Sequence, residues 1–191
     1  MRDFQRFARQ MLRHPAEVMA LAPSSAALAQ AMTAGIGPWT GPVVELGPGT
    51  GRFTRLLLAR GVRADELVLF EINPVFARDL RDRFPGVRIE ERPAQDIATL
   101  GLTGVGAVVS GLPLLSMRSN DRRAILGGAF DAMRPDGVFS QFTYGPQPPV
   151  EPSIAVALEI VGQRGPYVFG NLPPARVYRY VRSDMAKGSG F

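Results

Sequence analysis

Three acidic residues stand at the ends of three successive strand-like segments, where a bound ligand could use them. Glu45 lies two residues before the glycine-rich loop 47–51, Glu71 ends the segment "ELVLFE", and Asp96 follows the segment "VRIEE". Ligands of open α/β sheets bind at the carboxyl ends of the strands, so the three acids are expected at one site. Glu71, about 20 residues beyond the loop, is placed to accept both ribose hydroxyls, and Asp96 to accept an adenine amino group. Taken singly, Glu71 also fits a solvated acid and Asp96 a helix N-cap.

The loop "GPGTG" at 47–51 narrows the choice of nucleotide. A phosphate-binding P-loop requires Gly-Lys-Ser/Thr before its helix, and the chain has none. A dinucleotide fingerprint requires a third glycine at position 52, which is Arg52. A carboxylate at Glu45 would repel a pyrophosphate but would favour a ligand that carries ammonium and sulfonium charges. S-adenosylmethionine is such a ligand, and we expect it as the cofactor, with S-adenosylhomocysteine as its product.

Strand-like and helix-like segments alternate along most of the chain. Such alternation predicts an α/β fold, with a parallel sheet covered by helices on both faces. The expected strands are 42–46, 66–71, 87–91, 105–111 and 137–144, and the expected helices are 3–13, 24–34, 54–61, 74–84 and 121–133. Residues 154–162 and 175–182 are expected to form a closing antiparallel pair around the loop 165–174.

The segment 43–144 resembles the class I S-adenosylmethionine-dependent methyltransferases. "VELGPGTG" resembles their first motif, "FEINP" their second and "PAQDI" their third. The resemblance implies a Rossmann-like fold, with a seven-stranded, mostly parallel sheet flanked by helices and an antiparallel last strand. The cofactor-binding residues that it implies are Glu45, Gly47, Gly49, Thr50, Gly51, Glu71, Ile72, Ala94, Gln95, Asp96, Ser110, Gly111 and Leu112.

The segment "SGLPLLS", 110–116, follows the fourth expected strand, where this class binds the methyl acceptor. Methylases of exposed bases carry Asn or Asp, then Pro-Pro and an aromatic residue that stacks on the base. The chain lacks that aromatic residue, so its likeness to ribosomal RNA adenine dimethylases is partial. With "PSSAALAQAM" and "FGNLPPARVYRY", this apolar segment resembles the soluble bacterial phospholipid N-methyltransferases. That resemblance implies stepwise methylation of phosphatidylethanolamine toward phosphatidylcholine.

The segment 3–13 is an amphipathic helix with an apolar arc and a basic arc. Aromatic and aliphatic residues opposite arginines are typical of an interfacial membrane anchor, and a lid packed on the core is the alternative. The chain is therefore expected to divide into a helical membrane or lid segment, 1–36, and a methyltransferase domain, 37–191. The apolar arc holds Phe4, Phe7, Met11 and Leu12, and the basic arc holds Arg2, Arg6, Arg9 and Arg13.

A lipid ammonium must lose a proton before its nitrogen can accept a methyl group. Candidate proton acceptors are His14, Tyr144 and a water held by Ser110. The ring of Tyr144 could also hold a methylated ammonium through a cation–π contact of roughly 0.5–2 kcal/mol. Contacts to the lipid are expected from Arg176, with Tyr178 and Tyr180 beside it. For the hinge His14 and for these strand residues, purely structural roles are the alternative.

Composition sets the remaining expectations. The chain has 191 residues, a net charge of +5, no cysteine and one histidine, so we expect one globular protein without a metal site. The basic charge suits an anionic membrane surface, and the expected location is the cytoplasmic side of an inner membrane, peripherally bound. No nucleic-acid partner is expected in the preferred hypothesis, and the oligomeric state is left open. An RNA adenine methyltransferase and a non-catalytic cofactor-binding module are the alternatives.

Overall fold

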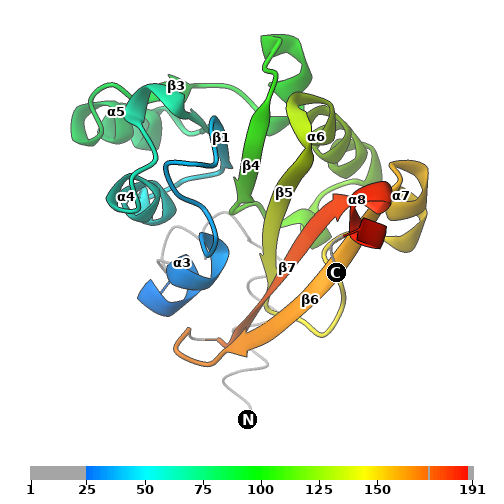
Figure 1. Cartoon of the computed structure of the whole chain (residues 1–191). Coiled ribbons are helices and arrows are strands. Elements are labelled where there is room, and N and C mark those ends of the chain that lie inside the picture. The colour runs from blue at the N-terminus through cyan, green and yellow to red at the C-terminus, as the bar shows by residue number, and fades with distance from the viewer. Residues whose placement is uncertain (1–24, 172, 189–191) are drawn as a thin grey trace.

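The computed structural model describes residues 25–171 and 173–188, and it is built around one seven-stranded sheet (Figure 1). The strand order is β3-β2-β1-β4-β5-β7-β6. The strands are β1 (Val43–Leu46), β2 (Leu67–Phe70), β3 (Arg88–Glu90), β4 (Val105–Ser110), β5 (Met133–Thr143), β6 (Ile160–Val168) and β7 (Ala175–Arg182).

Strands β1 to β5 pair in parallel, whereas β7 is antiparallel to both β5 and β6. This confirms the predicted seven-stranded, mostly parallel sheet and its antiparallel closing strand. The strand order reverses between β1 and β4, since the chain first builds outward to β3 and then returns to β4. The carboxyl ends of β1 and β4 therefore form the switch point at which such sheets bind ligands.

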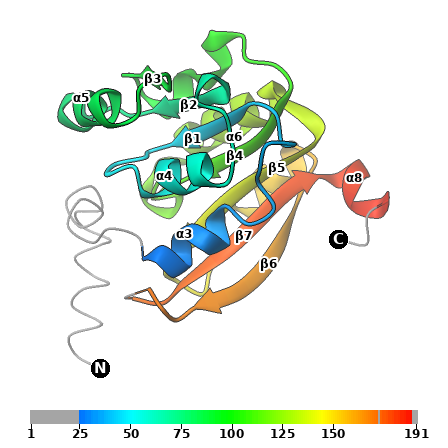
Figure 2. The ribbon, with the colours of Figure 1, turned by 60° about the vertical axis from the view of Figure 1, so that its left-hand side comes forward.

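Helices cover both faces of the sheet (Figure 2). Elements α3, α4 and α5 pack on one face, and η2, α6 and α7 pack on the other. The helices are α3 (Ala26–Met32), α4 (Arg52–Ala59), η1 (Ala64–Glu66), α5 (Pro74–Arg83), η2 (Ala94–Leu100), η3 (Leu114–Ser116), α6 (Ser119–Ala132), α7 (Pro152–Ala157) and α8 (Ser183–Gly188).

The central strands are apolar on both faces because both faces are covered. In β1, Val44 and Leu46 join the cluster under α6, whereas Val43 joins the cluster under α3 and α4. The side chains of a strand alternate between the faces, so Glu45 projects to the same face as Val43. A carboxyl group thus lies inside the apolar layer beneath α4.

Two of the expected helices begin with a capping side chain. Ser25 caps α3, where its hydroxyl accepts a hydrogen bond from the amide of Leu28. Pro74 opens α5, and the side chain of Asn73 accepts from the amides of Val75 and Phe76. The expected helix 3–13, with all of its basic and apolar residues and the nearby His14, lies outside the described residues.

The expected strand 154–162 is wrong in its boundaries. Residues 152–157 form helix α7, and β6 begins only at Ile160 and runs through "GPYV", which was expected to be a loop. Pro152 occupies the first turn of α7, where its missing amide costs nothing. The pair Gly165–Pro166 is tolerated in β6 because β6 is an edge strand and its register shifts between Arg164 and Tyr167.

Adjacent glycines in α6 give a test of this packing. A Cβ at Gly128 would lie 2.6 Å from Ile97 Cγ2 and 3.1 Å from the backbone nitrogen of Ala98, whereas one at Gly127 would lie 3.8 Å from Leu158. We expect Gly128→Ala to lower the free energy of unfolding by about 1–3 kcal/mol through overpacking. Gly127→Ala, the matched control, should raise it by up to about 1 kcal/mol through helix propensity. Urea unfolding of both variants measures this, and equal effects would contradict the packing of η2 on α6.

Candidate active site

The glycine-rich loop after β1 requires glycine for its backbone path. Gly47, Gly49 and Gly51 have φ values of 69°, 52° and 69°, in the left-handed region that other residues rarely adopt. Gly51 caps α4. A Cβ at this position would collide with the side chain of Leu80 on α5 and with the ring of Phe84, the C-cap residue of α5. At Gly49 the same position is open space, so a ligand can approach the loop backbone closely.

Glu71, directly after β2, ties this loop to the neighbouring strand. Its Oε2 accepts the amide of Gly49 at 3.0 Å, and its Oε1 accepts the amide of Asn73 at 2.8 Å. The residue is buried and its two oxygens are held by backbone donors. Each carboxylate oxygen still has a lone pair for a further donor, so the predicted contact to ribose hydroxyls is chemically possible.

Glu45 is fully buried beneath the loop. The hydroxyl of Thr54 on α4 donates to its Oε2 at 2.7 Å, whereas Oε1 has no partner among the described residues. Burial, more than the nearby charge of Glu71, raises the pKa of Glu45 to about 8. The carboxyl is therefore mostly protonated at neutral pH, and a cationic ligand beside it would favour the ionised form.

The loops after β1 and β4 touch through backbone atoms. The amide of Gly111 donates to the carbonyl of Leu46 at 2.8 Å, and a Cβ at Gly111 would lie 2.7 Å from the carbonyl oxygen of Gly47. A Cβ at Gly47 would in turn lie 2.8 Å from Cδ2 of Leu112. Ser110 is buried below this contact, and its hydroxyl accepts from the amide of Leu112. Two glycines are needed for this approach.

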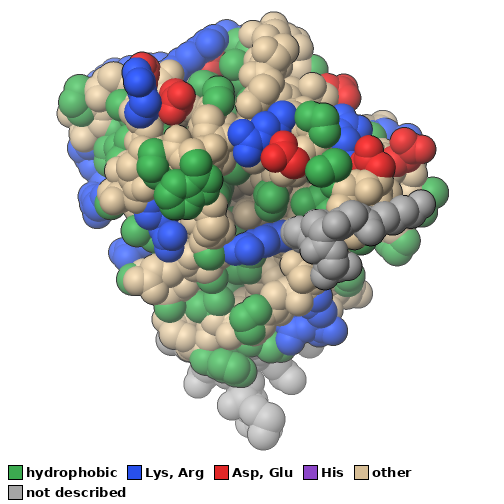
Figure 3. Space-filling model, in the orientation of Figure 1, with side chains coloured by type: hydrophobic (Ala, Val, Ile, Leu, Met, Phe, Trp, Pro, Cys, Tyr) green, Lys and Arg blue, Asp and Glu red, His purple; other side chains and the backbone are tan. Residues whose placement is uncertain are grey.

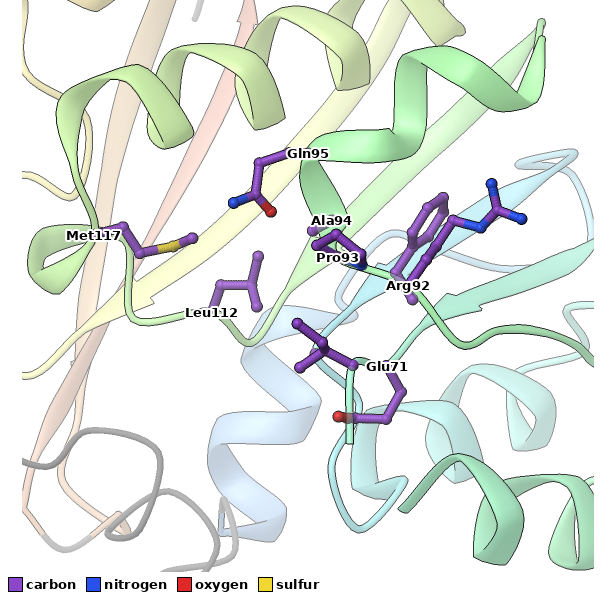
Figure 4. Close-up of a pocket in the computed structure, with 10 residues that line it drawn as sticks. Glu71, Arg92, Pro93, Ala94, Gln95, Leu112 and Met117 are labelled. Atoms are coloured by element: carbon purple, nitrogen blue, oxygen red, sulfur yellow. The ribbon is translucent and has the colours of Figure 1, made fainter. Parts of the chain in front are cut away.

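A cavity of about 190 Å³ opens at this edge of the sheet (Figure 4). In Figure 4, Glu71 and Arg92 lie at one end of the cavity, with Leu112, Met117 and Gln95 at the other. Ligand pockets usually measure roughly 300–1,000 Å³, so this cavity is smaller than a typical ligand site. Its walls are Gly47, Phe70, Glu71, Ile72, Arg92, Pro93, Ala94, Gln95, Leu112 and Met117.

Six of the expected cofactor-binding residues line the cavity, namely Gly47, Glu71, Ile72, Ala94, Gln95 and Leu112. Gly49, Thr50 and Gly51 belong to the adjoining loop, and Asp96 lies half-buried in the first turn of η2. These roles stay predictions. The sequence analysis missed Phe70, Arg92, Pro93 and Met117. Pro93 could have been predicted, because it is the first residue of the motif "PAQDI". No feature of the sequence around Met117 distinguishes that residue.

The expected acceptor residues lie on β5 and β7. Tyr144 follows β5 and is half-buried edge-on against Phe142, with ring centroids 5.3 Å apart. Burial raises its pKa, so the hydroxyl stays protonated at neutral pH. Arg176 stacks on the ring of Tyr167 at 3.8 Å, beside the carboxyl end of β5.

Tyr178 and Tyr180 are buried on one face of β7, and burial raises the pKa of both hydroxyls. Tyr178 pairs with Gln141, close to the carboxyl end of β5. Tyr180 pairs with Phe139, and its ring occupies the space above Gly162. The structure therefore brings Tyr178 nearer than Tyr180 to the loop edge of the sheet.

Two negative findings apply to residues 25–171 and 173–188. No group of three or more acidic or histidine side chains in that part of the chain could hold a metal ion. No helix in it is both long enough and apolar enough to pass through a bilayer.

Comparison with known proteins identifies the class of this fold. An ornithine lipid N-methyltransferase of Singulisphaera acidiphila is 32% identical over 155 residues, which cover 76% of this chain and 80% of that protein. A TehB-like S-adenosylmethionine-dependent methyltransferase from Corynebacterium glutamicum shares the fold with a TM-score of 0.63 and 14% identity, over 94% of this chain and 98% of its own. No model of a known protein family matches the chain.

A second solved structure agrees. The 1,6-didemethyltoxoflavin-N1-methyltransferase of Burkholderia thailandensis, with bound S-adenosylhomocysteine, has a TM-score of 0.63 and 16% identity, covering 93% of this chain and 87% of that one. The chain belongs to the class I S-adenosylmethionine-dependent methyltransferases. Within the class, it belongs to the family that contains the Singulisphaera lipid N-methyltransferase.

Membership of this class makes S-adenosylmethionine the methyl donor, as the glycine loop and its acids predicted. The residues present fit the donor. The open space over Gly49 admits it to the loop backbone, and the unpartnered Oε1 of Glu45 lies beneath the same loop.

The raised pKa of Glu45 predicts how stability depends on pH. Between about pH 4.5 and pH 8 the folded ligand-free chain binds more protons at this site than the unfolded chain, so this contribution to stability is lost as the pH rises. Glu45→Gln removes the titration but keeps an acceptor for Thr54. We expect the melting temperature of the variant, relative to the parent protein, to increase from pH 5 to pH 8. A difference that stays constant across this range would show that Glu45 does not titrate there.

Proposed function

We propose that the chain transfers methyl groups from S-adenosylmethionine to the headgroup amine of phosphatidylethanolamine, stepwise toward phosphatidylcholine, at a membrane surface. The observation that carries the proposal is the apolar wall of the site. Leu112 and Met117 line the cavity beside the β4 loop, and that loop, 110–116, has no aromatic side chain on which a base could stack. An apolar wall beside the methyl donor suits a lipid better than a base.

Ornithine lipid is the second candidate acceptor, because the Singulisphaera relative is an ornithine lipid N-methyltransferase. The two candidates share their chemistry. Each presents a primary amine several bonds from an anionic group and carries acyl chains. The same apolar wall and basic surroundings therefore serve either lipid.

The charge around the β6–β7 hairpin supports a membrane-bound substrate. Residues 160–182 carry Arg164, Arg176, Arg179 and Arg182 and no acidic residue. Phe169, in the turn, is 79% exposed. On the face shown in Figure 3, basic and hydrophobic side chains are spread over both parts, whereas acidic ones lie over the upper part. Basic and aromatic residues together favour an anionic bilayer interface.

The proposed reaction requires positioning more than covalent chemistry from the protein. When bound, S-adenosylmethionine supplies a methyl group activated by its sulfonium sulfur. The chain must hold the acceptor nitrogen in line with that methyl group and keep the nitrogen unprotonated. The carbonyls of residues 110–112 are placed to orient the amine. The proton leaves to His14 or to a water held by Ser110. Burial raises the pKa of Tyr144, the third expected acceptor, so its hydroxyl stays protonated at neutral pH and serves to orient the amine instead.

One incubation tests the proposal against its rivals. Purified protein is given labelled S-adenosylmethionine with vesicles of phosphatidylethanolamine, with vesicles of ornithine lipid, or with RNA. We expect label in a lipid headgroup, separated by chromatography, and none in RNA. Label in RNA alone would establish the base methyltransferase. Cofactor binding without transfer to any acceptor would establish a non-catalytic module.

The segment 1–36 is proposed to act as the membrane anchor or as a lid over the site. If the segment is an anchor, Phe4→Asp with Phe7→Asp should weaken binding to anionic vesicles at least about tenfold. Two aromatic rings that would enter the bilayer interface are lost, and two negative charges that the anionic lipids repel are added. Sedimentation with the vesicles measures it.

The matched control replaces two other apolar side chains with aspartate. Trp39 and Val156 are 74% and 78% exposed and lie before β1 and on α7. Trp39→Asp with Val156→Asp adds the same charge and should leave vesicle binding nearly unchanged. Equal losses in both double variants would assign the effect to net charge and contradict the anchor.

A further inference from the structure

Three polar side chains lie in register across the sheet at its carboxyl edge. Ser110 of β4 pairs with Gln141 of β5, and Gln141 pairs with Tyr178 of β7. Paired residues on neighbouring strands project to the same face, here the face covered by α6. All three are buried, with Gln141 1% and Tyr178 3% exposed. A polar row of this kind inside an apolar cluster calls for an explanation.

The hydrogen bonds of Gln141 fix the direction of its amide. Its Nε2 donates to the carbonyl oxygens of Leu112 and Phe142, both at 2.9 Å. Carbonyl oxygens only accept, so the amide nitrogen must face them and Oε1 must face the other way. Oε1 is shielded from solvent and has no partner among the described residues.

The hydroxyl of Tyr178, like Oε1 of Gln141, is buried and has no hydrogen-bond partner in the described chain. A buried polar atom without a partner is costly, and native proteins keep few of them. Two such atoms on residues paired in register indicate that a polar group from outside the chain completes them.

The row adjoins the site already described. Leu112, which receives the hydrogen bond of Gln141, lines the cavity and lies over Gly47 of the cofactor loop. One pair further toward the carboxyl edge, Arg176 stacks on Tyr167 and forms no ion pair with the described residues. Gln141 thus contacts the β4 loop through its amide nitrogen, and its register partner Tyr178 lies two residues from Arg176 along β7.

We infer that Gln141 Oε1 and the Tyr178 hydroxyl oxygen accept the N–H bonds of the acceptor amine, with Arg176 facing the anionic part of the same headgroup. This inference rests on the proposed function. Each transfer replaces one N–H bond with an N–CH₃ bond, converts the sulfonium to a thioether and releases one proton to solvent. A neutral primary amine has two N–H bonds for the two acceptors, whereas a dimethylated amine has none. The acceptors therefore act on the first transfer and not on the last.

Tyr178→Phe tests the inference with little disturbance, because the hydroxyl that it removes forms no hydrogen bond with the described residues. We expect kcat/KM to fall about tenfold on the primary aminolipid, the loss of one hydrogen bond in the transition state. On the N,N-dimethylated form of the same lipid, the change should stay below about twofold. Labelled S-adenosylmethionine and vesicles of phosphatidylethanolamine or its dimethyl derivative provide the assay, with a parallel pair made of ornithine lipid.

Gln141→Met is the second variant. We expect kcat/KM to fall on both substrates, because the hydrogen bond to Leu112 is lost, and to fall further on the primary amine than on the dimethylated one. Ser140→Ala is the matched control, because Ser140 is buried on the same strand and faces the other side of the sheet. We expect kcat/KM of Ser140→Ala to be unchanged on both substrates.

Equal losses on primary and dimethylated lipid, or no loss in Tyr178→Phe, would overturn the inference while leaving lipid methylation intact. Failure of the parent protein to methylate either lipid would instead overturn the proposed function, and the inference with it.

Discussion

The close approach of two backbones at the switch point determines the geometry of the whole site. Gly47 and Gly111 meet with no room for a Cβ on either residue, which places Leu112 directly over the cofactor loop. Leu112 thereby contacts the glycine loop through its side chain and Gln141 through its carbonyl. Under the proposed function, a shift of the β4 loop would move both the donor side and the acceptor side of the site.

The two buried acidic residues of the site, Glu71 and Glu45, differ in how far their hydrogen bonds are satisfied. Glu71 is satisfied by two backbone amides and stabilises the loop as it stands. Glu45 is buried with one oxygen unpartnered, so its burial is a cost that the surrounding fold must offset. The site thus combines one carboxyl group whose two oxygens are held by backbone amides with one whose second oxygen has no partner among the described residues.

Local patterns in the sequence were sufficient to predict much of this fold. Apolar runs predicted β2 and β4, and a run interrupted only by Glu45 predicted β1, since strands buried on both faces need them. The spacing of Gly47, Glu71 and the motif around Ala94 predicted one wall of the cavity. The pair Gly165–Pro166 misled the prediction of β6, because the tolerance of an edge strand for such residues depends on its neighbours. Met117 and Gln141 could not be found from the sequence, because only the folded chain brings them to the site.

Hydrogen bonds at both ends of α3 connect it to the β6–β7 hairpin near the other end of the chain. The amide of Ser25 donates to Oδ1 of Asn171 at 2.8 Å, and Arg179 of β7 donates to the carbonyl of Ala34 at 3.0 Å. These two bonds clasp α3 against the β6–β7 hairpin, from both of its ends. A force applied at Ser25 is therefore transmitted through Asn171 to the hairpin that carries Arg176, as well as through the packed face of α3 to the sheet.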